Sequence, residues 1–263
     1  MSTRSYAAAD SATMLRRNLR HALRYPSMTV SVVGMPIIIL LLFVDVLGGA
    51  MSASLAGAST AGATYIDYVV PGILVMTVAS GSMPTAVAVC TDMTEGIVAR
   101  FRTMAISRAS ILTGHVVGSM IQTMLSVSLV IGVSLLLGFR PTTAPLRWIA
   151  AIAVLALLTL ALTWLAVALG LVTKTAEAAS NVVMPLFLLP FLSSAFVPLA
   201  TMPTGVRWFA QYQPFTSIID TLRGLLMGAP IGNSAVIAIV WCVAIGLAGY
   251  LWARTVFNRG PAQ

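Results

Sequence analysis

Six long apolar runs dominate the chain, and each is long enough to cross a bilayer as a helix. A helix rises about 1.5 Å per residue, so about 20 apolar residues span a hydrocarbon core of about 30 Å. Prolines interrupt several runs, and membrane helices tolerate them when neighbouring helices satisfy the freed carbonyls. The predicted spans are residues 27–47, 65–91, 111–139, 146–172, 178–197 and 234–253.

An amphipathic pattern precedes the first run, at residues 11–25. Leu15, Leu19 and Leu23 fall on one helical face, and a stripe of arginines lies beside them. We expect a helix in the membrane interface, with its apolar face toward lipid and its arginines toward the headgroups. Pro26 is expected to end this helix and to begin the first span. The arginines of the interfacial helix are Arg16, Arg17, Arg20 and Arg24.

A charged island interrupts the apolar pattern at residues 91–115. Charged side chains are costly inside a bilayer, so we expect this island in water at one membrane face. Gly96 is expected to break the second span, because glycine in a helix interior costs about 1 kcal/mol. Phe101 and Arg102 then indicate a short helix that inserts into a groove on a soluble partner; a packed turn that only joins two spans is the alternative. We take residues 91–110 as a coupling loop, with candidate residues Asp92, Glu95, Gly96, Arg100, Phe101, Arg102 and Arg108.

A second unusual segment, residues 198–232, is too rich in proline and polar residues to span, yet too apolar for a free loop. Two short amphipathic helices fit its pattern, at residues 205–212 and 215–227, and its aromatic side chains suit a membrane interface. Asp220 and Arg223 are three residues apart, so they can pair on one helical face. We expect a re-entrant hairpin that covers the outer end of a transport path. Its candidate residues are Pro198, Pro203, Trp208, Pro214, Asp220 and Arg223.

Two local signals concern helix ends and helix contacts. Thr175 precedes the fifth span and has the side chain of a helix N-cap. Small residues four apart in the sixth span, such as Gly249 and Ala253, predict a close approach to another helix.

Composition places the chain in a membrane. It is 59% hydrophobic and 8% charged, whereas soluble domains carry about 25% charged residues. Basic residues favour cytoplasmic loops, and most of the 15 lysines and arginines fall on the side of the termini and the charged island. This predicts cytoplasmic N and C termini. Basic residues are not interleaved with aromatic ones as in a nucleic-acid groove, so we expect no nucleic-acid partner.

The sequence offers little catalytic chemistry. It has no G-x-x-x-x-G-K-[ST] phosphate loop, and its only lysine is Lys174, so we expect ATP hydrolysis on a partner. No His and Cys cluster has metal-ligand spacing, and we expect neither a metal nor a cofactor on this chain. An ion-coupled transporter that uses Asp45 as a relay is one alternative. An intramembrane enzyme that uses Ser82 and His115 is another, although their predicted depths disagree.

Two parts of the chain resemble a known family. Residues 95–108 resemble the cytoplasmic loop of ABC-2-type exporter permeases and read E-G-I-V-A-R-F-R-T-M-A-I-S-R. The outer re-entrant segment of these permeases is similar to residues 196–203 and 213–228, which read F-V-P-L-A-T-M-P and Q-P-F-T-S-I-I-D-T-L-R-G-L-L-M-G. The resemblance is nearest to the daunorubicin/doxorubicin resistance-type branch. Two positions depart from the family: Ala105 stands where Pro is usual, and Gln213 where Asn is common.

The apolar pattern and the resemblance lead to one fold class, an all-α polytopic membrane protein with a single domain over residues 1–263. It has six transmembrane helices, an N-terminal interfacial amphipathic helix, and a re-entrant outer helical hairpin between spans five and six. The resemblance implies that the interfacial helix and the coupling loop contact ATP-binding subunits, which carry ATP and magnesium. It also implies a second permease subunit, in a homodimer or a heterodimer. The implied activity is export of an amphipathic drug or lipid across a bacterial-type cell membrane, hence multidrug efflux and antibiotic resistance.

Overall fold

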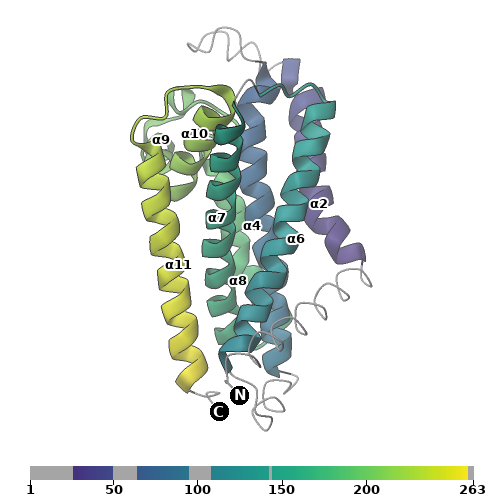
Figure 1. Cartoon of the computed structure of the whole chain (residues 1–263), viewed down its shortest axis with the longest axis vertical. Coiled ribbons are helices and arrows are strands. Elements are labelled where there is room, and N and C mark those ends of the chain that lie inside the picture. Colours follow the sequence, from purple (N-terminus) through teal and green to yellow (C-terminus); the bar gives the residue numbers. More distant parts are fainter. Residues whose placement is uncertain (1–25, 50–63, 95–107, 142–143, 260–263) are drawn as a thin grey trace.

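The computed structural model describes residues 26–49, 64–94, 108–141 and 144–259. Within these ranges the chain forms eight α-helices and no strand. The α-helices are α2 (Pro26–Leu41), α4 (Tyr65–Thr94), α6 (Arg108–Leu136), α7 (Pro145–Val172), α8 (Ala176–Leu188), α9 (Thr204–Tyr212), α10 (Pro214–Met227) and α11 (Ser234–Arg259). In Figure 1, α4, α6, α7 and α11 run side by side along the long axis, and α9 and α10 lie together at one end.

Four of the predicted spans are confirmed as helices long and apolar enough to cross a membrane. The first and fifth predicted spans are shorter apolar helices, Val33–Val46 and Ala176–Leu192. The fifth is shorter than the predicted residues 178–197: α8 ends at Leu188, and a 3-10 turn follows it. Pro190 lies in that turn and has no N–H to continue the helical hydrogen bonding. The 13 residues of α8 rise about 20 Å, less than a hydrocarbon core of about 30 Å.

Helix ends follow local side-chain chemistry. At the start of α4, the Thr64 backbone N–H donates to the Asp67 carboxylate at 3.2 Å, in the manner of a capping box. At the start of α8, the Thr175 hydroxyl accepts a hydrogen bond from the Ala178 N–H at 3.2 Å, which confirms the predicted N-cap. α10 ends at Gly228, whose φ of 77° is left-handed and suits glycine.

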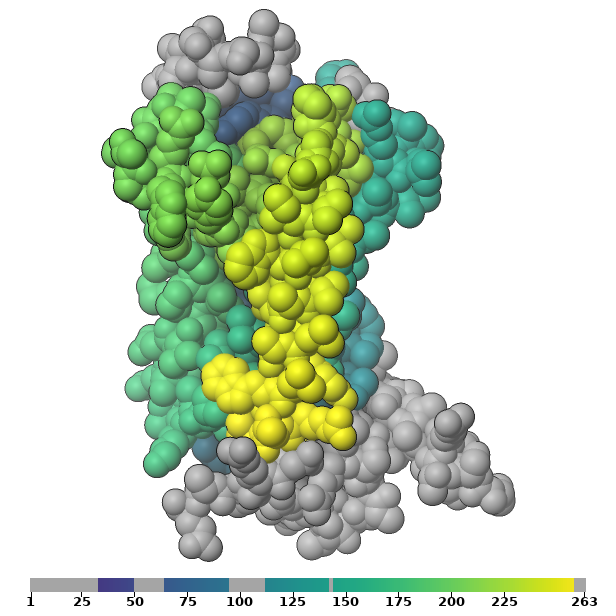
Figure 2. Space-filling view, turned by 90° about the vertical axis from the view of Figure 1, so that its left-hand side faces the viewer, coloured from purple at the N-terminus to yellow at the C-terminus, as the bar shows by residue number. Residues whose placement is uncertain are grey.

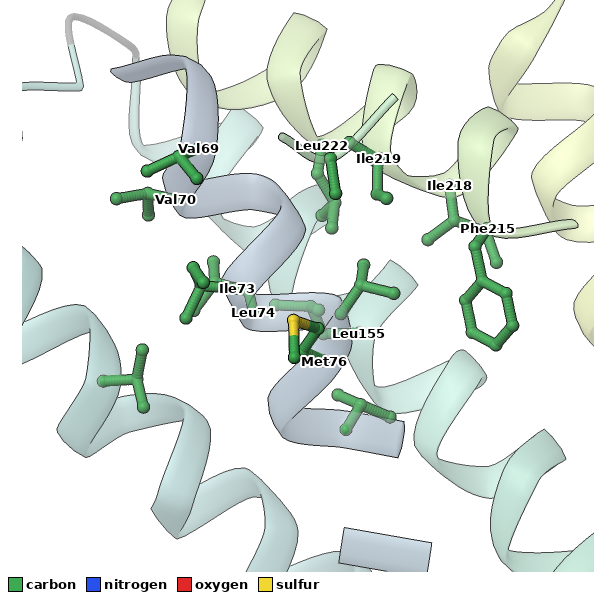
Figure 3. Packing of buried hydrophobic residues seen from close by; sticks show 14 of the residues in the cluster. Val69, Val70, Ile73, Leu74, Met76, Leu155, Phe215, Ile218, Ile219 and Leu222 are labelled. Carbon is green, nitrogen blue, oxygen red and sulfur yellow. The ribbon is translucent and has the colours of Figure 1, made fainter. Parts of the chain in front are cut away.

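The central helix of the bundle is α4. It contacts α2, α6, α7, α8 and α10, and 72% of its most apolar stretch is buried, against 17% in α11. Figure 3 shows side chains of α4, α7 and α10 gathered in one cluster. Leu74, Leu155 and Ile219, one from each helix, are at most 1% exposed. Because interiors are close-packed, a displacement of α4 must be felt by the helices around it.

Glycines bring several of these helices into backbone contact. A Cβ on Gly249 of α11 would lie 2.6 Å from the Leu165 backbone nitrogen of α7, which confirms the predicted close approach of the sixth span. A Cβ on Gly170 of α7 would lie 2.5 Å from the Ala86 carbonyl oxygen of α4. The α11–α7 and α7–α4 contacts therefore leave no room for a side chain at these points, as in other membrane helix pairs that pack through small residues.

The outer surface of α11, in contrast, is not packed against another helix of the described chain. Figure 2 shows this helix running down the surface of the molecule, with its upper part beside the green α9 region. Val236, Val240 and Leu251 are 65%, 60% and 57% exposed. In a bilayer, such an apolar face needs no protein cover, because lipid tails are as apolar as leucine.

Candidate functional site

A polar cluster joins α10 to the rest of the bundle, and we call it the α10 cluster: Tyr68, Ser194, Thr216, Asp220 and Arg223. Arg223 lies at its centre. Its Nη1 donates to Asp220 Oδ1 at 2.8 Å, which confirms the predicted pair. Its Nη2 donates to the carbonyl oxygens of Ser194 at 2.9 Å and of Tyr68 at 3.2 Å. One guanidinium thus contacts α4, the turn at residues 193–196, and α10.

The Tyr68 ring completes the environment of Arg223. The guanidinium carbon lies 4.0 Å from the ring centroid, within the range of a cation–π interaction. The Arg223 side chain is 17% exposed, and its Nε is buried with no hydrogen-bond partner among the described residues. A buried charge is costly unless it is paired and hydrogen-bonded, so the acceptors around Arg223 are needed to hold it there.

Ser194 ties the 193–196 turn into the same cluster. The Tyr68 hydroxyl donates to the Ser194 carbonyl at 2.9 Å, and the Ser194 hydroxyl donates to Asp220 Oδ1 at 2.9 Å. The Ser194 N–H donates to the Thr216 hydroxyl at 3.4 Å. Every member of the cluster therefore bonds to a member on another element.

Pro214 and Gln213 determine how α10 begins. Pro214 is the first residue of α10, where its missing N–H costs nothing and its φ is already helical. Gln213, the residue before it, donates from Nε2 to the Leu192 carbonyl at 2.6 Å. The glutamine that departs from the family pattern thus links the start of α10 to the end of the 3-10 turn Leu189–Leu192.

The two short helices predicted at residues 205–212 and 215–227 are confirmed as α9 and α10. Pro203 is the N-cap of α9, and Pro198 precedes a 3-10 turn at Leu199–Thr201. Trp208 is 66% exposed on α9, as a side chain at a membrane interface would be. That the segment is re-entrant stays a prediction.

A second polar contact lies at the other end of α4. His115 Nε2 of α6 is 2.9 Å from Asp92 Oδ2 of α4, and the two side chains are 11% and 13% exposed. Asp92 therefore belongs to a helix and not to the predicted loop, whereas its place in water stays a prediction. α4 continues to Thr94, beyond the predicted end at residue 91. Packing against α6 supplies the carboxylate with a polar partner, which offsets part of the cost of its burial.

Most residues of the predicted coupling loop lie outside the described residues, and so does the predicted interfacial helix. Arg108 is described as the first residue of α6. The predictions for the rest are untested: Glu95, Gly96, Arg100, Phe101 and Arg102 in the loop, and Arg16, Arg17, Arg20 and Arg24 in the interfacial helix.

The alternative chemistries find little support among the described residues. Ser82 donates its hydroxyl to the Ala79 carbonyl at 2.6 Å, whereas His115 contacts Asp92. The structure therefore does not bring Ser82 and His115 together as nucleophile and base. Asp45 lies on an exposed position of the π-helical segment Leu42–Val46, unlike the buried acids of ion relays.

Sequence reasoning missed the partners of the predicted charges. Tyr68 and Ser194 are separated by 126 residues, and Tyr68 and Arg223 by 155, so no local spacing indicates these contacts. The Asp92–His115 contact spans 23 residues across two helices. Matching the depths of charged and polar residues on neighbouring spans is the one signal that could have indicated it.

The bundle and its polar contacts agree with a comparison of the whole sequence. The model of the ABC-2 type transporter family matches residues 11–227. This chain belongs to the ABC-2 type transporter family. With its long apolar helices, ABC-2 membership makes it a multi-pass protein of the cell membrane.

Two relatives carry more specific names. The chain is 28% identical over 245 residues to the daunorubicin resistance ABC transporter permease protein DrrB1 of Streptomyces coeruleorubidus, an alignment covering 93% of this chain and 83% of the relative. It is 26% identical over 177 residues to the probable doxorubicin resistance ABC transporter permease protein DrrC of Mycobacterium tuberculosis, covering 67% of this chain and 64% of the relative. The resemblance to the drug-resistance branch of ABC-2 permeases is thereby confirmed.

Proposed function

We propose that this chain is the permease subunit of an ATP-driven exporter that moves an amphipathic drug or lipid out of the cytoplasm or the inner leaflet. The observation that carries the proposal is the ABC-2 family match, which extends from residue 11 through the end of α10. The names of both relatives, permeases of anthracycline resistance, support an aromatic, amphipathic cargo.

In the proposed complex, separate ATP-binding subunits hold ATP and magnesium and push on the coupling loop. The loop joins α4 to α6, and α4 is the most deeply buried of the long helices. A push at this end acts directly on the core, because α4 contacts five other α-helices. A second permease subunit, the same or a related chain, would form the other wall of the transport path.

The test is reconstitution of the chain with an ATP-binding subunit that co-purifies with it. ATP or a non-hydrolysable analogue is added outside inside-out vesicles, where the ATP-binding subunits face, and doxorubicin movement into the lumen is followed by fluorescence quenching. We expect movement only with hydrolysable ATP, and none when the phosphate-loop lysine of the ATP-binding subunit is replaced by alanine.

Two controls separate the proposal from its main alternative. Vesicles that contain the chain without the ATP-binding subunit should move no doxorubicin, even with an imposed proton or sodium gradient. Gradient-driven movement by the chain alone, lost in Asp45→Asn, would instead establish an ion-coupled transporter.

A further inference from the structure

The α10 cluster has a geometry that bears on how a push on α4 reaches the outer segment. We infer that Arg223 is a positioning residue that joins α4, the 193–196 turn and α10 into one rigid unit. Displacement of α4 at its coupling-loop end then moves α10 with it. This inference rests on the proposed function, since it concerns the route by which ATP hydrolysis acts on the outer segment.

The side chain of Arg223 contacts three elements at once. Arg223 donates to Asp220 on its own helix, to the Tyr68 carbonyl on α4 and to the Ser194 carbonyl in the turn. It also lies over the Tyr68 ring. A planar guanidinium can direct donors to several acceptors at fixed angles, which the compact ammonium of lysine cannot do.

Apolar packing beside the α10 cluster also holds α10 against the bundle. Ile218, Ile219 and Leu222 of α10 are fully buried, and Figure 3 shows them on the side of α10 that faces α4 and α7. To separate α10 from α4, this apolar surface would have to be exposed while Arg223 lost its acceptors. Leaving a buried charge without partners is strongly unfavourable, so the two helices are expected to move together.

α4 and the 193–196 turn pack against each other without a gap. A Cβ on Gly72 of α4 would lie 2.5 Å from the Ala195 Cβ, closer than atoms of neighbouring side chains approach. The remaining seam is the one between the turn and α10, where Ser194 meets Thr216 and Asp220. If α4, the turn and α10 move as one rigid unit, this seam must stay closed during transport.

α4 is long enough to connect the coupling-loop end of the bundle with the α10 cluster. Tyr68 and Asp92 lie 24 positions apart in the same helix, which continues through Pro71 and Pro84, and this separation corresponds to a rise of about 36 Å. A helix of that length, fixed at its upper end by Arg223 and packed along its sides, can carry a displacement from one membrane face to the other. Without the Arg223 contacts, α10 would not follow a displacement of α4.

The experiment cross-links the seam. In Ser194→Cys/Thr216→Cys, a disulfide fixes the turn to α10 while Arg223 and Asp220 are not substituted. Ser194→Cys removes the hydroxyl that donates to Asp220, so the single-cysteine variants are the controls for that loss. The native Cys90 and Cys242 are buried and free of disulfides, and gel mobility checks that the new bond forms. In reconstituted vesicles with the ATP-binding subunit, we expect the same ATP-driven doxorubicin movement before and after reduction. Transport that stops on oxidation and returns on reduction would overturn the inference, because the seam would then be a gate.

Two lysine variants test the arginine itself. Arg223→Lys keeps the charge but loses the guanidinium geometry, and we expect several-fold less doxorubicin moved per ATP hydrolysed. Arg207→Lys is the matched control, since Arg207 is an exposed arginine of the same outer segment, and it should behave like the wild type. The disulfide should restore coupling to Arg223→Lys, which a general loss of folding would not allow.

The outcomes are distinct from failure of the proposed function. A wild-type ratio of transport to hydrolysis in Arg223→Lys would overturn the positioning role. If Arg223→Lys does not assemble, the cross-link in the chain with its native arginine decides the matter alone. Wild-type vesicles that move no doxorubicin with ATP would count against the proposed function, and with it the coupling role.

Discussion

Replacing Gly249 with alanine should weaken the contact between α11 and α7. The new Cβ would lie 2.6 Å from the Leu165 backbone nitrogen and 2.8 Å from the Trp164 carbonyl carbon. Both atoms belong to the α7 backbone and cannot rotate aside, so α11 itself must move. A normal separation of about 3.4 Å requires a shift of about 0.8 Å.

The size of the effect follows from that shift. Opening a contact by 0.5–1 Å removes about a quarter to a half of its attraction, and overpacking an interior costs about 1–3 kcal/mol. Alanine also favours a helix over glycine by about 1 kcal/mol, which offsets part of the loss. Gly246→Ala is the matched control: it lies on the same helix, and its new Cβ would meet Ala161 Cα at an ordinary 3.5 Å.

The assay is the free energy of unfolding of the purified chain in mixed micelles, by SDS titration with tryptophan fluorescence. Both variants gain the same helix preference, so the difference between them isolates the steric cost. We expect Gly249→Ala to be less stable than Gly246→Ala by about 1–3 kcal/mol. Equal stabilities would refute the reasoning, because α11 could not then be in backbone contact with α7.

Three further predictions concern the Thr175 N-cap, the Asp92–His115 contact and the predicted coupling loop. Thr175→Ala should lower the free energy of unfolding by about 1 kcal/mol through loss of the N-cap, whereas Thr175→Ser should not; the same titration measures both. His115→Leu removes the imidazole that contacts Asp92 and should cost about 1–3 kcal/mol, with a smaller loss in His115→Gln, which can still donate. Phe101→Ala or Arg102→Glu should leave the chain in the membrane but reduce doxorubicin-stimulated ATP hydrolysis and co-purification of the ATP-binding subunit. Wild-type values of both would remove the coupling loop from the proposal.

Local sequence signals account for the elements that the structure confirms. The lengths of the apolar runs predict six spans, because a run of about 20 apolar residues is stable across a bilayer only as a helix. Four of these six are confirmed as helices long enough to cross. The short helices α9 and α10, the Thr175 cap and the Asp220–Arg223 pair all depend on residues within a few positions of one another. Helix periodicity fixes such neighbours without knowledge of the fold.

Contacts between distant parts of the chain were decided by the tertiary structure. Asp92 was expected in a loop of the charged stretch, yet it lies in α4, and His115 of α6 contacts it in a partly buried position. The Asp220–Arg223 pair was predicted from the spacing of the two residues on one helix, yet Arg223 also binds Tyr68 and Ser194 on other elements. In both cases a charge gained partners that no spacing along the sequence reveals.

The sequence by itself determined which segments form the long apolar helices, and the tertiary structure decided which of them lies at the centre. Mean hydropathy does not make that distinction: α4, at 1.8, has 72% of its apolar stretch buried, while the more apolar α11, at 2.2, has 17% buried. The physical reason is the solvent. Lipid tails are as apolar as a protein core, so hydropathy drives a helix into the bilayer but does not choose its neighbours. That choice falls to close packing at small residues such as Gly72 and Gly249, and to the buried polar contacts of Arg223.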